Sequence, residues 1–110
     1  MMDVIVINPK RYDLNYKKID GSLESLQELV DGYIEPCAPV ELRDQGIELL
    51  ANEEGLLKGL ELNENFEPFF LVGTVVAVGI GDEDFISLTA DQTHFLAYWL
   101  FKLERDNLGL

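Results

Sequence analysis

"FFLVGTVVAVGI", residues 69–80, is the stretch that decides the fold of this chain. The run is nearly all apolar, rich in Val, and interrupted by Gly73, Thr74 and Gly79. A membrane-spanning helix needs about 20 apolar residues, so the run is too short to cross a bilayer. Its β-prone, near-continuous apolar character instead predicts a central strand that is covered on both faces.

The segments on both sides of this stretch predict further strands. Downstream, "GDED" at residues 81–84 predicts a turn and residues 85–88 a short return strand, which together make a hairpin. Upstream, a strand that starts near residues 32–35 must be interrupted by Pro36 and Pro39 or confined to a sheet edge. Three more strands are predicted at residues 3–7, 16–19 and 46–51, of which the first two could form a hairpin.

A first helix is predicted at residues 22–30. Ser22 is a natural N-cap, and Glu24 in the first turn suits the helix dipole. Gly32 is placed to end the helix in a left-handed conformation. One apolar face is formed by Leu23, Leu26, Leu29 and Val30.

A second helix is predicted at residues 89–106. It opens at Thr89, because Thr89 and Gln92 have the spacing of a capping box. Residues 95–101 are all apolar, so apolar side chains surround the helix. We expect one face to pack on the sheet and the other on a partner or a second copy; a helix buried wholly within one domain is the open alternative. The interface residues would be Phe95, Tyr98, Trp99 and Phe101.

Together these elements predict one α+β domain over residues 1–110. We expect a mainly antiparallel or mixed sheet of five to six strands with two helices, and the opening hairpin, helix and strand resemble the start of a β-grasp fold. The length suits a single domain, and the apolar fraction of 47% is that of a globular chain. One cysteine cannot form an internal disulfide, and no basic leader precedes the first apolar run. The expected location is therefore the cytoplasm, without a membrane anchor.

Charge is the strongest feature of the composition. Eight basic residues against 21 acidic ones give a formal net charge of −13. The excess lies between Asp20 and Asp91, where Arg43 and Lys58 are the two basic residues. Such a field repels nucleic-acid phosphates and anionic lipid and attracts basic proteins, so direct nucleic-acid and membrane binding are not expected. Acidity that serves solubility alone is the other interpretation.

The sequence contains little that predicts catalysis. His94 is the lone histidine and lies within the apolar helix, where a structural role is the more common one. Cys37 has no basic neighbour in the sequence to lower its pKa. The acidic pairs do not have the spacing of a calcium loop, and no common metal or nucleotide motif is present. We therefore expect a non-enzymatic protein without a cofactor or metal.

"NEEGLLKGLELNEN", residues 52–65, has two interpretations: a binding loop, or a turn between strands. The second predicts that Gly55 adopts a backbone conformation that other residues avoid. Leu56, Leu57 and Leu60 would then return the chain to the core.

Three motifs resemble a family of short proteins from phages, plasmids and Gram-positive bacteria that is known only as a domain of unknown function. They are "IDGSLESLQELVDGYIE" at residues 19–35, "NEEGLLKGLELN" at 52–63 and "VGTVVAVGIGDEDFISLT" at 72–89. The resemblance covers residues 4–92, which leaves the apolar part of the last helix as an addition in this chain. It implies a mobile-element setting but no known activity or cofactor.

These observations favour an acidic binding protein of mobile-element origin. It would act by protein–protein contact, as an inhibitor of a host defence protein or by DNA mimicry, through Glu53, Glu54, Asp82, Glu83 and Asp84. A small-ligand binder for a nucleotide or other anion is the alternative, and an accessory subunit of unknown role is a third. The anion contacts would be Lys10, Arg11, Lys17, Lys18, Lys58 and Asn63.

Overall fold

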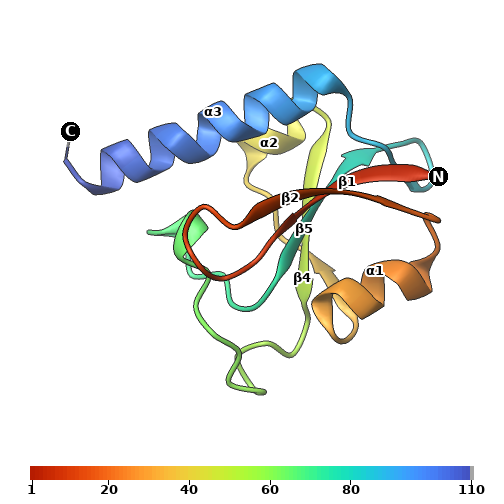
Figure 1. The fold of residues 1–110 in the computed structure, drawn as a ribbon, viewed down its shortest axis with the longest axis horizontal. Helices are drawn as coiled ribbons and strands as arrows, with labels where there is room; N and C mark the ends of the chain where they lie inside the picture. Colours follow the sequence, from red (N-terminus) through yellow and green to blue (C-terminus); the bar gives the residue numbers. More distant parts are fainter. Residues whose placement is uncertain (110) are drawn as a thin grey trace.

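The computed structural model, which describes residues 1–109, is built on a six-stranded sheet (Figure 1). The strand order is β2-β1-β5-β4-β3, and β6 pairs with β5 where β1 diverges from it. Every pairing is antiparallel, so the α+β prediction is confirmed in its antiparallel form. The strands are β1 (Met2–Ile7), β2 (Leu14–Ile19), β3 (Ile34–Pro36), β4 (Ile47–Asn52), β5 (Val75–Ile80) and β6 (Phe85–Ile86).

Helices cover both faces of this sheet. Figure 1 shows α3 (Ala90–Asn107) on one side and α1 (Leu23–Val30) on the other. A short helix α2 (Val40–Arg43) and a 3-10 turn η1 (Glu64–Phe66) complete the α3 side. The hairpin β1–β2, α1 and β3 follow one another in the order expected of a β-grasp opening.

The core has two layers that meet at β5. Val75 and Ala77 face the α3 layer with Leu96 and Leu100, whereas Val76 and Val78 face α1. All four β5 side chains are fully buried, which confirms a central strand covered on both faces. Alternation of this kind follows from the two-residue period of a strand.

The predicted strand at residues 69–80 is wrong in its first half. The strand begins at Val75, and residues 69–73 form a loop in which Gly73 has a positive φ of +75°. Phe69 lies in a stacked pair with Trp99 of α3, with ring centroids 5.9 Å apart. Phe69 and Leu71 of this loop therefore pack on the α3 side of the core. The return strand is also shorter than predicted, because it ends at Ile86.

The helix starts are as predicted, but one helix end is not. Ser22 caps α1 by accepting from the Ser25 N–H, and Thr89 and Gln92 form both hydrogen bonds of the capping box of α3. Asp31, at φ +59°, takes the left-handed position predicted for Gly32. The Asn52 side chain approaches Gly32 so closely that a β-carbon there would lie 2.6 Å from its Nδ2 atom. The sequence did not predict α2, because four residues are too few to show a helical period.

The two edges of the sheet, β2 and β3, differ in what they offer to another strand. The Asn8 N–H donates to the Asp13 carbonyl, so by alternation Tyr16 and Lys18 of β2 point their N–H groups outward. On β3, Ile34 and Pro36 face outward, and Pro36 has no N–H. The prediction that proline confines this strand to an edge is confirmed.

Candidate functional site

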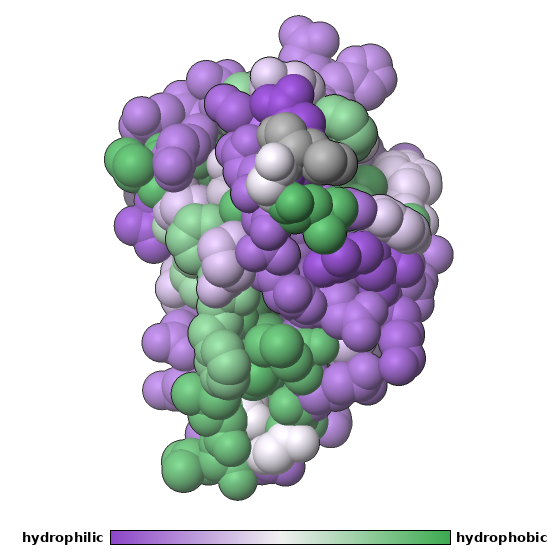
Figure 2. Space-filling view, turned by 90° about the vertical axis from the view of Figure 1, so that its left-hand side faces the viewer, coloured by the Kyte–Doolittle hydropathy of each residue, from purple (hydrophilic) through white to green (hydrophobic). Residues whose placement is uncertain are grey.

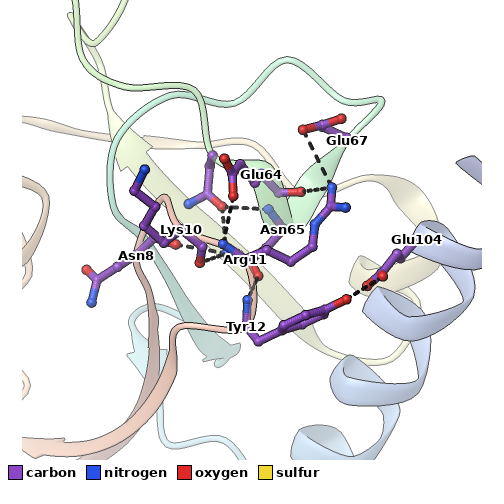
Figure 3. A network of polar contacts seen from close by, with 9 residues as sticks. Asn8, Lys10, Arg11, Tyr12, Glu64, Asn65, Glu67 and Glu104 are labelled. Carbon is purple, nitrogen blue, oxygen red and sulfur yellow. Dashed lines mark hydrogen bonds and ion pairs between the residues drawn. The ribbon is translucent and has the colours of Figure 1, made fainter. Parts of the chain in front are cut away.

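The basic loop between β1 and β2, residues 8–13, is fixed by contacts with residues 61–67 (Figure 3). The Arg11 N–H donates to a carboxylate oxygen of Glu64 at 3.0 Å, and its guanidinium donates to the Glu64 carbonyl at 2.8 Å. The same guanidinium lies 3.5 Å from a carboxylate oxygen of Glu67. Arg11 is therefore already bound within the molecule.

Tyr12 and Asn65 complete this network. The Tyr12 N–H donates to Asn65 Oδ1 at 2.8 Å, and the Tyr12 hydroxyl reaches Glu104 of α3 (Figure 3). This hydrogen bond to the Glu104 carboxylate raises the pKa of Tyr12. Asn65 Nδ2 donates to the carbonyls of Asn8 and Lys10. The Asn65 side-chain amide thus fixes the backbone of the basic loop through hydrogen bonds to Asn8, Lys10 and Tyr12.

Asn63, predicted as an anion contact, is a structural residue. Its side chain is fully buried, and Nδ2 donates to the carbonyls of Ile7 at 3.0 Å and Gly73 at 2.9 Å. Its Oδ1 accepts from the Asn65 backbone and side chain. No donor of Asn63 remains for a ligand, because both amide hydrogens are used.

The other predicted anion contacts each have a separate internal partner, apart from Lys17. Lys10 pairs with Glu61 at 3.4 Å and Lys18 with Asp3 at 3.0 Å. The Lys58 ammonium donates to the Asp31 carbonyl at the end of α1. Lys17 has no ion pair within residues 1–109. The structure does not gather these cations around one shared site.

The predicted acidic residues are exposed, but they form two groups. Glu53 and Glu54 follow β4, beside the start of β5, whereas residues 82–84 follow the end of β5. A six-residue strand separates the groups by roughly 20 Å. No member of either group is in an ion pair among the described residues 1–109.

The acidic loop, residues 53–60, has an ordered backbone. The Lys58 N–H donates to the Glu54 carbonyl at 2.9 Å, and the Leu60 N–H to the Gly55 carbonyl at 3.0 Å. The prediction for Gly55 is wrong: Gly59 has the positive φ, and Gly55 is needed because a β-carbon would lie 2.6 Å from Val72 Cγ2. The loop is therefore pinned by close packing.

Two leucines of this loop do not return to the core as predicted. Leu56 and Leu57 are 67% and 87% exposed, whereas Leu60 is half-buried against Gly73. Phe70, on the neighbouring loop, is 69% exposed. Figure 2, which views the molecule from the left-hand side of Figure 1, shows an apolar patch on its lower part.

Leu56, Leu57 and Phe70 line a surface hollow of about 340 Å³, which we call the acid-rimmed groove. Cys37, Leu71 and Val72 are among its apolar walls. Sequence analysis identified Glu53 and Glu54 but not the exposed Leu56, Leu57 and Phe70, because the neighbouring residues do not distinguish an exposed apolar side chain from a core one. The groove is defined by Glu35, Glu53, Glu54, Leu56, Leu57 and Phe70.

The predicted interface of α3 divides into two faces. Phe95 and Trp99 pack partly buried against the core on the α3 side, so they belong to the fold. Tyr98 and Phe101 are exposed, at 59% and 64%. The helix thus packs on the sheet with one face, and two of the four predicted side chains remain free.

The two residues considered for catalysis are not assembled into a reactive group. Burial, with smaller effects from the carboxylates of Glu48 and Glu35, raises the pKa of Cys37 to about 12, so the thiol stays protonated at neutral pH. His94 is exposed and makes no side-chain hydrogen bond within residues 1–109. Over the same residues, no three His, Cys, Asp or Glu side chains lie close enough to hold a metal ion. None of the described helices is both long and apolar enough to span a bilayer.

Comparison with known families decides where the chain belongs. A family model described as a domain of unknown function, DUF3846, matches residues 2–100. The chain is a member of this family. The expected resemblance to a domain of unknown function is therefore confirmed, and the match also includes residues 95–100, so the start of the apolar helix segment is not an addition. No curated protein matches the chain, and no solved structure does.

Proposed function

We propose that this DUF3846 protein is a non-enzymatic binding protein that recognises a basic protein partner. The observation that carries the proposal is the contrast between its two kinds of charge. Arg11, Lys10, Lys18 and Lys58 are engaged by internal carboxylates or carbonyls, whereas the acidic residues at positions 53–54 and 82–84 are exposed and unpaired among residues 1–109. A net charge of −13 speeds encounter with a basic surface.

A counter-defence role is the narrower form of this proposal. In it, a protein of phage or mobile-element origin would bind a host nuclease or another nucleic-acid-handling protein. The separation of the two acidic groups favours contact through one end of the sheet over mimicry of a continuous row of DNA phosphates. The anion-binding alternative is less favoured, because its cations other than Lys17 already have internal partners.

Affinity capture from a bacterial lysate, at about 50 mM and about 500 mM salt, tests the charge contribution, because exposed charges are screened at high ionic strength. We expect a basic partner to be recovered at low salt and lost at high salt. Replacement of the two acidic groups together, by Gln and Asn, should remove it. If the same amount of partner protein were captured at both salt concentrations and with the substituted variant, the proposal would be contradicted.

A further inference from the structure

The acid-rimmed groove combines an apolar surface with three carboxylates. Leu56, Leu57 and Phe70 stand out from the surface, and Glu35, Glu53 and Glu54 line the same hollow. We propose that this groove binds a short amphipathic basic segment of a partner protein, with apolar side chains against Leu57 and Phe70 and Lys or Arg side chains against the carboxylates. The inference rests on the proposed function and names its binding surface.

Packing of the fold does not account for the exposed leucines. The loop is already held by Leu60 against Gly73, by the close approach of Gly55 to Val72, and by hydrogen bonds within residues 54–60. Phe70 lies between two residues that do pack, because Phe69 stacks on Trp99 and Leu71 contacts the core. An ordered loop that presents apolar side chains to solvent is a feature of binding surfaces.

The charge of the groove selects the occupant. Its lining contains three carboxylates and no Lys or Arg, and the nearby Lys58 ammonium is turned to the Asp31 carbonyl. An acidic segment or an anionic lipid surface would be repelled, and a second copy of a chain with a charge of −13 would be repelled as well. A basic segment with apolar anchors fits both the surface and the field.

The neighbouring strand excludes one way of binding. β3 borders the groove through Glu35, and Cys37 directly after the strand also lines it, but Pro36 removes an outward donor from that edge. A partner therefore gains little from strand addition there, and side-chain contacts with Leu57, Phe70 and the carboxylates must supply the affinity.

The test uses NMR titration of the ¹⁵N-labelled protein with three synthetic peptides of about 12 residues, the length of a short helical ligand. The first has Leu at helical spacing with Lys between, the second is its scrambled version, and the third replaces Lys by Glu. We expect the first to shift the amides of residues 53–58 and 70–72 and to bind at least about tenfold more tightly than the second. The third should not bind.

Protein variants locate the site without changing the net charge. The double variant Leu57→Ser, Phe70→Ser should weaken binding of the first peptide about tenfold, as expected for anchor residues. Leu23→Ser is the matched control, because Leu23 is also exposed and lines a hollow with Glu83 and Asp84 on the α1 side. It should leave binding unchanged. Thermal unfolding should show that both variants remain folded.

Four outcomes would overturn the groove proposal. One is equal weakening by Leu23→Ser and the double variant, which would place the bound peptide elsewhere. Another is equal binding of the scrambled peptide, which would show that the spacing of the apolar anchors is not recognised. In both cases the proposed function would stand. A third is a dimer that the double variant dissociates, since the groove would then join copies of the chain. The fourth is that none of the peptides binds. The proposed function would be contradicted as well only if the lysate capture also recovered no salt-sensitive partner.

Discussion

The loop between β1 and β2 and the loop after β4 carry opposite charge and are built in opposite ways. In the basic loop, the charged side chain of Arg11 and the amide of Asn65 hold the backbone in place. In the acidic loop, close packing at Gly55 holds the backbone, and the carboxylates of Glu53 and Glu54 form no ion pair within residues 1–109. The basic side chain of Arg11 thus helps to hold the fold together, whereas the side chains of Glu53 and Glu54 remain exposed and without an ion pair among residues 1–109.

The largest effect on the free energy of unfolding should come from Asn63, which binds the backbone at the base of the basic loop. Asn63→Ala leaves the buried carbonyls of Ile7 and Gly73 without their donor, so we expect a loss of about 3 kcal/mol in the free energy of unfolding. Urea denaturation measures it. Asn15→Ala on β2 is the control, because that amide is exposed and should cost under about 0.5 kcal/mol. A loss under about 1 kcal/mol for Asn63→Ala would show that the amide is dispensable.

A smaller loss should follow from crowding the acidic loop. Gly55→Ala places a β-carbon 2.6 Å from Val72 Cγ2, and we expect it to cost about 2 kcal/mol. Gly59→Ala is the comparison, since nothing lies within 4 Å and only its φ of +68° is unfavourable, at about 1 kcal/mol. Thermal unfolding of both variants ranks them. If Gly59→Ala cost more, the loop would be held by its backbone conformation rather than by packing.

Removing the charge of Arg11 should cost about 1 kcal/mol, since its hydrogen bond to the Glu64 carbonyl is partly buried. Arg11→Met keeps most of the aliphatic length. Lys58→Met, which loses an exposed contact with the Asp31 carbonyl, should cost less, at about 0.3 kcal/mol. Chemical denaturation of the two variants compares them. If Arg11→Met and Lys58→Met lowered the free energy of unfolding equally, the partial burial of the Arg11 hydrogen bond would add no stability.

Asp20 is an acidic residue that takes part in the structure, in contrast to Glu53 and Glu54. Hydrogen bonds from Ser25 and Ser22 lower its pKa from 3.8 to about 2. Because the folded pKa lies below the unfolded one, its contribution to stability is complete above about pH 4 and is lost as the pH falls toward 2. NMR titration of the side chain should show the low pKa, and Ser25→Ala should raise it. An unchanged value in that variant would contradict this assignment.

The smallest effect on stability is expected at the acidic loop itself. Glu53→Gln with Glu54→Gln should change the free energy of unfolding by less than about 0.5 kcal/mol, because neither carboxylate has an internal ion-pair partner within residues 1–109. Thermal unfolding at low salt checks this. A loss above about 1 kcal/mol would assign the two residues to the fold and end the contrast between the loops.

Much of the fold could be predicted because its signals are local. The β5 run, the Ser22 cap and the Thr89–Gln92 capping box depend on residues that are near one another in the sequence. The loop at residues 69–73 could not be predicted, since the apolar Phe69 is satisfied by Trp99 of α3, thirty residues downstream. The composition of residues 69–73 is that of a strand, and only the tertiary contact with Trp99 distinguishes a loop from a strand here.

The candidate site was less predictable than the fold. Lys10 and Arg11 looked free because their partners, at residues 61–67, are distant in the sequence. Asn63 looked like a surface amide, although its acceptors on Ile7 and Gly73 bury it. Leu56 and Leu57 looked like core residues, but apolar side chains also occur on protein surfaces. Glu53 and Glu54 were identified correctly as exposed.

The unequal edges of the sheet have a consequence for assembly. Two β2 strands from different molecules could pair through the outward N–H groups of Tyr16 and Lys18. The positive charges of Lys17 and Lys18 oppose this pairing. Growth into a fibre needs a second edge of the same kind, and Pro36 leaves β3 with a single outward donor in its three residues. Edge-to-edge growth of the folded protein beyond two molecules is therefore disfavoured at β3.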